Sequence, residues 1–367
     1  MQGLMMDVPL MISSLIKHAD RYHGDTEIVS RTVEGPIHRY TYHDAHTRAR
    51  KLARALARQG VNPGDRVGTL AWNGYRHFEL YYAVSGMEAV IHTINPRLFQ
   101  HQLEYIINHA EDKVVFFDLT FVPLVEKLAA ACKAVKTWAA LCDRAHLPDA
   151  EIPGLLCYEE LLADETDDYD WPSFDENTAS TLCYTSGTTG HPKGVLSSHR
   201  STLLHAYAIA LPDTKGLSAR SVVLPVVPMF HVNAWGLPYA APLVGAKSVF
   251  PGPGMDPANL YDLYERERVN TTSGVPTVWL NLIRYMQEHK LKFSTLKVVT
   301  VGGAACPPAM LRAFTEEFRV RVQHGWGMTE TSPVATVNRS KPKHDRLAPE
   351  DQFQVALKQA RDRKSVV

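Results

Sequence analysis

The chain has 367 residues, of which 45% are apolar and 21% are charged. Lys plus Arg and Asp plus Glu number 39 each, so no global charge favours a nucleic acid or an anionic membrane, and any anion site must be local. The composition excludes a disordered, fibrous or nucleic-acid-coating protein and favours a globular chain of two subdomains.

The cysteines and the N-terminus predict a cytoplasmic protein. The five cysteines are widely spaced and form no C-x-x-C pair, which argues against a disulfide framework and against a zinc site. The N-terminus has no basic start, and Asp7 interrupts its short apolar run, so it lacks the layout of a secretory signal. We expect an amphipathic helix over residues 9–22.

Helix and strand patterns alternate along the chain. Residues 41–60 place small and apolar side chains at helical spacing, 64–74 form a short apolar run typical of a strand, and 77–90 predict a helix. Further strands are predicted at 112–118, 221–228, 246–252 and 296–303, and further helices at 257–268, 278–289 and 308–318. This alternation predicts an α/β protein with largely parallel sheets flanked by helices.

Two segments have unusual charge. Residues 221–246 contain no charged side chain and are long enough to cross a bilayer. Four prolines there argue against a spanning helix, so we expect buried strand and loop and no transmembrane segment, while peripheral membrane contact stays open. Residues 149–176 carry eleven acids, and we expect this block to be a solvated connection between two lobes of one domain.

The stretch YTSGTTGHPKG, residues 184–194, follows an apolar run and precedes a helix predicted to start near Ser198 or Ser201. Its glycines tolerate positive φ, so the loop can turn backbone amides inward into a nest for an anion, to which hydroxyls and a lysine add donors. The residues that predict a polyphosphate site are Thr185, Ser186, Gly187, Thr188, Thr189, Gly190 and Lys193. A Walker loop is excluded, because Lys193 is followed by Gly194. The alternative, a mobile surface loop, explains the glycines but not the clustered hydroxyls.

Four motifs together resemble the adenylate-forming (AMP-binding) superfamily, which includes acyl-CoA synthetases, luciferases and the adenylation domains of peptide synthetases. They are YTSGTTGHPKG (184–194), PMFHVNAWG (228–236), VGGAACPP (301–308) and HGWGMTETSP (324–333). Within the superfamily, VLPVVPMFHVNAWGLPYA is most similar to medium- and long-chain fatty acyl-CoA synthetases. The resemblance implies the large N-terminal domain of that fold over residues 1–340, with two similar α/β lobes and a smaller β-rich part. It also implies a charged, partly helical and truncated tail over 341–367, the small C-terminal domain being absent.

The resemblance implies a reaction in which a carboxylate attacks the α-phosphate of ATP, pyrophosphate leaves, and coenzyme A captures the acyl group of acyl-AMP. This chemistry requires neutralised phosphate charge more than a protein nucleophile, so no catalytic Cys or Ser is expected. Catalytic roles are implied for Lys193, His231, Thr185 and Glu330, with Thr185 and Glu330 as Mg²⁺ ligands. From the residues alone, two alternatives stay open: Glu330 as a surface acid and His231 as a hydrogen-bonded core residue.

The nucleotide site implied by the resemblance centres on Trp326, on which adenine would stack. Its other members are Gly302, Gly303, Ala304, His324, Gly325, Gly327 and Thr329, together with the glycine-rich loop. Trp326 departs from the tyrosine common in the family but keeps a flat aromatic face. His324 replaces a glutamine or similar residue often seen at this position. Without the family match, Trp326 would be taken as a core residue.

The acyl site implied by the resemblance has His231 near the carboxylate and Trp235 as a gate over a long-chain tunnel. Val232, Tyr239, Val275 and Trp279 are candidate apolar walls. Because residues 221–246 offer no acid to pair with an α-ammonium, we expect a fatty acid rather than an amino acid. Two alternatives stay open: a ligase for short, thioether or aryl acids, and a nucleotide-binding remnant without turnover. A homodimer also stays open.

Overall fold

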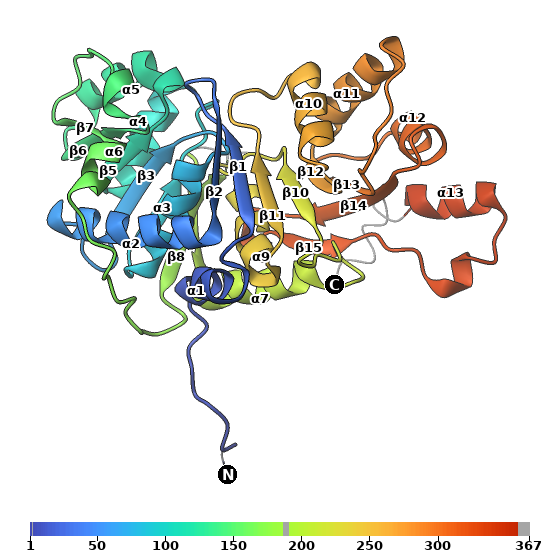
Figure 1. Ribbon diagram of the computed structural model, residues 1–367, viewed down its shortest axis with the longest axis horizontal. Helices are drawn as coiled ribbons and strands as arrows, with labels where there is room; N and C mark the ends of the chain where they lie inside the picture. The colour runs from blue at the N-terminus through green and yellow to red at the C-terminus, as the bar shows by residue number, and fades with distance from the viewer. Residues whose placement is uncertain (2, 186–190, 359–367) are drawn as a thin grey trace. The chain divides into compact units, whose positions relative to one another are not determined.

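The computed structural model describes residues 1, 3–185 and 191–358. The chain divides into two compact units. The first comprises residues 1–25, 42–71 and 76–204, and the second comprises residues 26–41, 72–75 and 205–367. Each unit is built around one sheet (Figure 1).

The first unit holds a seven-stranded sheet in the order β7-β6-β5-β3-β4-β8-β9. Its strands pair in parallel, except that β8 and β9 are antiparallel. Its elements are α1 (Ile12–His23), α2 (Tyr42–Arg58), β3 (Arg66–Leu70), α3 (Tyr75–Gly86), β4 (Val90–Thr93), α4 (Gln100–Ala110), β5 (Asp112–Phe117), α5 (Val122–Ala131), β6 (Thr137–Ala140), β7 (Leu155–Cys157), α6 (Tyr158–Ala163), β8 (Ala179–Thr185), β9 (Lys193–Ser198) and α7 (His199–Ala210), which ends in the second unit.

The second unit holds an eight-stranded sheet in the order β15-β14-β13-β12-β10-β11-β1-β2. The pairs β1–β2 and β14–β15 are antiparallel and the rest are parallel. Its elements are β1 (Glu27–Arg31), β2 (Ile37–Thr41), β10 (Val222–Pro225), α8 (Val232–Trp235), α9 (Leu237–Val244), β11 (Lys247–Phe250), α10 (Pro257–Arg266), β12 (Thr271–Gly274), α11 (Pro276–Glu288), β13 (Val298–Val301), α12 (Pro308–Arg312), β14 (Arg321–Gly327), β15 (Val334–Val337) and α13 (Pro349–Lys358).

The core of the second unit forms where α10 and α11 pack beside β12 and β13 (Figure 1). Apolar side chains on the inner faces of these helices, such as Leu263 and Met286, are fully buried against strand residues such as Val299. Burial of this kind stabilises a fold by roughly 25 cal/mol per Å² of apolar surface. The predicted α/β class with mostly parallel sheets is confirmed.

Three predicted elements differ from the structure. The helix predicted over 77–90 ends at Gly86, and Val90 already belongs to β4. The glycine-rich stretch leads into strand β9, which pairs with β8 as a hairpin, whereas we had expected it to lead directly into a helix. Residues 221–246 form β10 as expected, but α8 and α9 replace the predicted loop. None of the helices in the described parts of the chain has the length and apolar character that crossing a bilayer requires.

The acidic block over residues 149–176 lies wholly within the first unit, so it does not connect the two units. Glu165 is only 5% exposed and pairs with Arg54 and Arg58 of α2. Glu159 pairs with Arg48 of the same helix. The prediction of a solvated block is therefore wrong for these two acids, because α2 presents a row of arginines that the sequence pattern could not match to them.

Candidate active site

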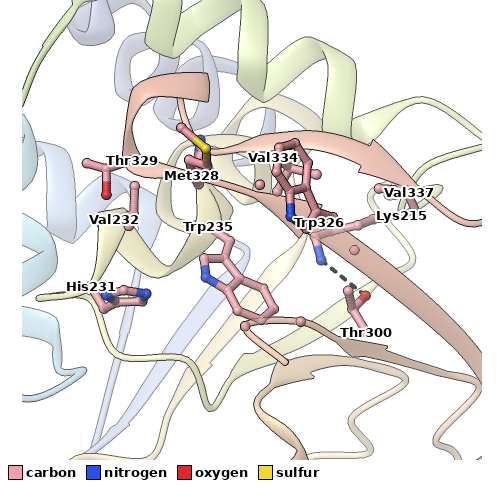
Figure 2. Close-up of a pocket in the computed structure, with 15 residues that line it drawn as sticks. Lys215, His231, Val232, Trp235, Thr300, Trp326, Met328, Thr329, Val334 and Val337 are labelled. Carbon is pink, nitrogen blue, oxygen red and sulfur yellow. Dashed lines mark hydrogen bonds between the residues drawn. The ribbon is translucent and has the colours of Figure 1, made fainter. Parts of the chain in front are cut away.

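A cavity of about 260 Å³ lies in the second unit, where β13 and β14 end (Figure 2). Parallel strands bring their carboxyl ends to one edge of a sheet, the usual place for a ligand site in such folds. Three of the four sequence motifs contribute to its lining. The lining residues are Lys215, His231, Val232, Trp235, Thr300, Gly302, Gly303, Gly325, Trp326, Gly327, Met328, Thr329, Pro333, Val334 and Val337.

One wall of the cavity comes from a left-handed turn in the motif PMFHVNAWG. Val232, Asn233, Ala234 and Trp235 have φ values of 44°, 55°, 49° and 55°. A left-handed helix costs L-residues about 1–2 kcal/mol each, and positive φ is most unfavourable for a β-branched residue such as Val232. Such strain persists only where the surroundings fix it, and it clusters at functional sites. The turn carries Val232 and Trp235 into the lining of the cavity.

Gly302 allows the indole of Trp235 to pack closely against the backbone. A Cβ atom at Gly302 would lie 2.7 Å from Cη2 of Trp235 and 3.1 Å from the carbonyl oxygen of Gly325. Carbon atoms pack no closer than about 3.5–4.0 Å at their optimum, so only glycine fits here. The sequence predicted Gly302 beside adenine, and the structure brings it against Trp235.

His205, which the sequence analysis did not identify, packs against the left-handed turn at Gly236. A Cβ atom at Gly236, where φ is 76°, would lie 2.6 Å from Nδ1 of His205. The backbone N–H of Val334 donates to Nε2 of His205 over 3.1 Å. Burial, with a smaller contribution from the nearby charge of Lys215, lowers the pKa of His205 to about 4. The imidazole is therefore neutral near pH 7, and it joins the turn to the start of β15.

The opposite side of the cavity is the β14–β15 hairpin. Trp326 is 39% exposed, a large value for a tryptophan, and its ring lines the cavity. The register shifts between Trp326 and Gly327, and a Cβ atom at Gly327 would lie 1.9 Å from the carbonyl oxygen of Pro333. That carbonyl accepts from the N–H of Met328 over 3.0 Å. Gly327 thus lets the hairpin close tightly beneath Thr329.

Glu330 follows on the 3₁₀ turn Thr329–Thr331 and is exposed. Within the described residues its carboxylate makes no ion pair, so it is free to meet a cation. The described residues also contain no group of three His, Cys, Asp or Glu side chains that could hold a metal ion. One carboxylate fits Mg²⁺, which usually keeps waters and substrate phosphates in its shell, better than it fits a metal held by protein side chains alone.

Lys215 is a cavity residue that the sequence analysis did not identify. It is 3% exposed, and its Nζ donates to Ser273 Oγ over 2.8 Å and to Thr300 Oγ1 over 3.1 Å. Burial lowers its pKa to about 7. A lone lysine after a helix is normally exposed, and only the packed structure shows that this one points inward (Figure 2).

The glycine-rich stretch belongs to the first unit, and residues 186–190 lie outside the described part of the chain. Ser186, Gly187, Thr188, Thr189 and Gly190 therefore have no structural account here. Thr185 ends β8 and Lys193 begins β9, with the Lys193 side chain exposed. Tyr184, the first residue of the stretch, is held in place by a hydrogen bond. Its hydroxyl lies 2.6 Å from Nδ1 of His109. Burial is the main cause that raises the pKa of Tyr184 to about 12, so the hydroxyl stays protonated.

Several predicted site residues lie elsewhere in the second unit. Of the described residues that line the cavity, none is Tyr239, Val275 or Trp279. Trp279 is fully buried in the core, where its Nε1 donates to the carbonyl oxygen of Gly274 over 3.1 Å. His324 instead lines a smaller hollow beneath α13, with Nε2 3.0 Å from the carbonyl oxygen of Ala304.

Comparison with known proteins shows the family of the chain. Residues 15–354 match the family model described as AMP-binding enzyme. The medium-chain-fatty-acid–CoA ligase of Ectopseudomonas oleovorans is 50% identical over 98% of this chain and 66% of its own length. The 3-methylmercaptopropionyl-CoA ligase of Ruegeria lacuscaerulensis is 50% identical over 98% of this chain and 67% of its own length.

Among solved structures, the inhibitor-bound N-terminal domain of FACL13 from Mycobacterium tuberculosis has a TM-score of 0.79 at 24% identity. That match covers 94% of this chain and 80% of the other, and it shows a shared fold. The chain spans about two thirds of the length of the two curated relatives. The chain belongs to the AMP-binding enzyme family.

Proposed function

We propose that this chain carries the carboxylate- and nucleotide-binding part of an AMP-forming fatty acid–CoA ligase. The observation that carries the proposal is the cavity itself. It joins an apolar wall from Val232 and Trp235 to an exposed aromatic face at Trp326, and the exposed Glu330 directly follows the lining residue Thr329 in the chain. An acyl chain, an adenine ring and a phosphate-bound cation each find a matching surface in this unit.

In the proposed reaction a carboxylate oxygen of the fatty acid attacks the α-phosphorus of ATP. The bond between that phosphorus and the oxygen bridging to the β-phosphate breaks, and pyrophosphate leaves as an anion. A carboxylate is already ionised near pH 7, so the first step needs no general base. His231, exposed beside the turn, would donate to the reacting carboxylate or the α-phosphate, and Lys193 would hold the outer phosphates. Coenzyme A thiol would then displace AMP from the acyl-adenylate.

The nucleotide would be held by its base and by its phosphates. Stacking on Trp326 is worth roughly 1–3 kcal/mol, and the ring is exposed enough to accept it. Gly303 and Gly325 leave space for close approach beside it. Glu330 would hold Mg²⁺, which supplies positive charge to the phosphate oxygens as pyrophosphate leaves. Thr185 is proposed as the second oxygen ligand.

The chain length of the acid is proposed from the size of the cavity. At about 260 Å³ it is smaller than the roughly 300–1,000 Å³ typical of sites for drug-sized ligands. A short or medium acyl chain therefore fits better than a long one. The second candidate, a ligase for a short thioether acid, is favoured by the same volume and by the methylmercaptopropionyl-CoA ligase among the relatives.

The proposal is tested by acid-dependent exchange of radiolabelled pyrophosphate into ATP, with acids of two to sixteen carbons and with methylthiopropionate. We expect exchange to peak with a short or medium acid. Lys193→Ala and Glu330→Gln should each reduce it at least 100-fold. Matched controls are Lys297→Ala and Glu288→Gln, which change exposed residues outside the cavity.

Binding of a non-hydrolysable acyl-adenylate, 5′-O-(N-octanoylsulfamoyl)adenosine, separates binding from turnover. Binding without exchange would support a nucleotide-binding remnant. Neither binding nor exchange with any acid would reject the proposed function. The cytoplasmic location and the homodimer stay predictions from the sequence.

A further inference from the structure

Lys215 places a buried amino group in the lining of the cavity. Its side chain reaches two hydroxyls, Ser273 and Thr300, and within the described residues it meets no carboxylate at ion-pair distance. An ammonium group has three N–H donors, so one remains for another acceptor. Because Lys215 lines the cavity, that donor is available to a bound molecule.

The backbone fixes Lys215 in this position. After α7 ends at Ala210, the N–H of Lys215 donates to the carbonyl oxygen of Ile209 over 3.0 Å. The Thr214 hydroxyl donates within the same turn to carbonyl oxygens of α7, and its own carbonyl accepts from the side chain of Gln323. Gly216 follows with φ of 62°, a conformation that favours glycine. The lysine therefore points inward because the turn is built to hold it there.

A purely structural role accounts poorly for a lysine at this position. Burial of a charged group without a counter-ion is unfavourable, and two hydroxyls compensate for it only in part. The lowered pKa of Lys215 expresses the same cost. An apolar side chain of similar length would fill the space without that cost, so the ammonium is better explained by a ligand that needs it.

Lys215 and His231 lie on opposite sides of Trp235 (Figure 2). A substrate whose activated carboxylate lies near His231 would extend past the indole of Trp235 toward Lys215. The far end of its chain would then meet an N–H donor rather than an apolar surface. A plain alkyl chain leaves that donor unpaired, whereas an oxygen at the chain end accepts from it.

We propose that Lys215 selects short or medium carboxylic acids that carry a second oxygen acceptor, a hydroxyl or a carboxylate, at the end remote from the activated carboxyl group. This inference rests on the proposed function. The cost of an unpaired buried donor corresponds to roughly a 5- to 150-fold preference for such acids over the matching alkyl acids. Lys215 would act in binding and specificity, with no part in bond breaking.

The test measures binding of acylsulfamoyl adenosines to the 367-residue chain by titration calorimetry. Three series of four to ten carbons are compared: alkyl, ω-hydroxyalkyl and ω-carboxyalkyl. For at least one length, the chain should bind an ω-oxygen analogue 5- to 150-fold more tightly than the alkyl analogue. The hydroxyl and carboxylate series show which oxygen is preferred. Lys215→Met should abolish the preference and bind the alkyl analogues at least as tightly, and the exposed control Lys297→Met should keep it.

Each result decides the question. Alkyl analogues that bind without any preference for ω-oxygen at every length would overturn the inference and leave the proposed function standing. A preference that persists in Lys215→Met would also overturn it. No binding by any of the three series would reject both. The preference of the unchanged chain is informative even where the variant fails to fold.

Discussion

The Cα atom of Gly302 lies against the indole of Trp235, so closely that a methyl group there would come within 2.7 Å of Cη2. Gly302→Ala should therefore push Trp235 toward the centre of the cavity. We expect affinity for the octanoyl adenylate analogue to fall at least 10-fold, with a loss of stability of about 1–3 kcal/mol from overpacking. Calorimetric titration and thermal denaturation measure the two effects.

The matched control is Gly325→Ala, which changes another cavity glycine. A Cβ atom there would meet Thr300 Cγ2 at 3.7 Å, an ordinary van der Waals contact. Its effect on binding should be several-fold smaller than that of Gly302→Ala. Equal losses of affinity in the two variants would show that the contact between Gly302 and Trp235 does not determine binding.

The left-handed turn depends on Gly236 for two reasons, and they can be measured separately. At Gly236 φ is 76°, and an added Cβ atom would also meet the His205 ring at 2.6 Å. At Gly60 φ is 78°, with nothing within 4 Å of an added Cβ atom. Gly60→Ala should therefore cost only the conformational strain, about 1 kcal/mol. Gly236→Ala should cost at least about 2 kcal/mol more in chemical denaturation, and similar costs would exclude a clash with His205.

Residues of three sequence motifs meet in one cavity because the fold places the ends of their strands together. The stretches 228–236 and 302–304 follow β10 and β13, and 324–329 ends β14 and begins the next turn. In a sheet where these strands pair in parallel, their carboxyl ends lie at one edge. The motif residues Trp235, Gly302 and Trp326 accordingly line one cavity.

Other features could not be predicted because they depend on tertiary contacts. The helical spacing of residues 77–90 continues through a turn, and nothing local marks where α3 ends and β4 begins. Positive φ over four residues other than glycine contradicts local preference, so only the packed surroundings can impose the turn at Val232–Trp235. Lys215 belongs to no sequence motif. Its burial depends on the turn at Thr214, whose carbonyl oxygen accepts a hydrogen bond from Gln323 of β14.

A buried ion pair in the first unit gives a prediction about stability. Glu79 is fully buried and accepts from Arg48 Nε over 2.7 Å and from the Tyr158 hydroxyl over 2.6 Å. Arg48→Met would leave the carboxylate without its counter-ion, at a cost of about 3–5 kcal/mol. The control Arg50→Met, on the same helix, loses one bond to the carbonyl oxygen of Tyr169 and should cost about 1 kcal/mol. A difference below about 1 kcal/mol in urea denaturation would contradict this account.

Burial of Lys215 makes the stability of the chain depend on pH in a defined direction. The pKa of Lys215 is lowered from 10.5 to about 7. Below pH 7 the folded and unfolded chains both hold the proton, and the folded chain bears the full cost of the buried charge, on the order of 5 kcal/mol. Between pH 7 and 10.5 the unfolded chain binds more protons than the folded chain, so the free energy of unfolding rises with pH.

Lys215→Met removes this cost but also leaves the hydroxyls of Ser273 and Thr300 without their donor, a loss of about 1–3 kcal/mol. The variant should therefore be more stable than the unchanged chain at pH 6, by about 2 kcal/mol or more. At pH 9.5 most of the penalty has gone, so the advantage should vanish or reverse. Urea denaturation at the two pH values, with Lys297→Met as the exposed control, measures the change. A stability difference that stays constant between the two pH values would mean that folding does not lower the pKa of Lys215, because stability depends on pH only where the folded and unfolded chains differ in bound protons.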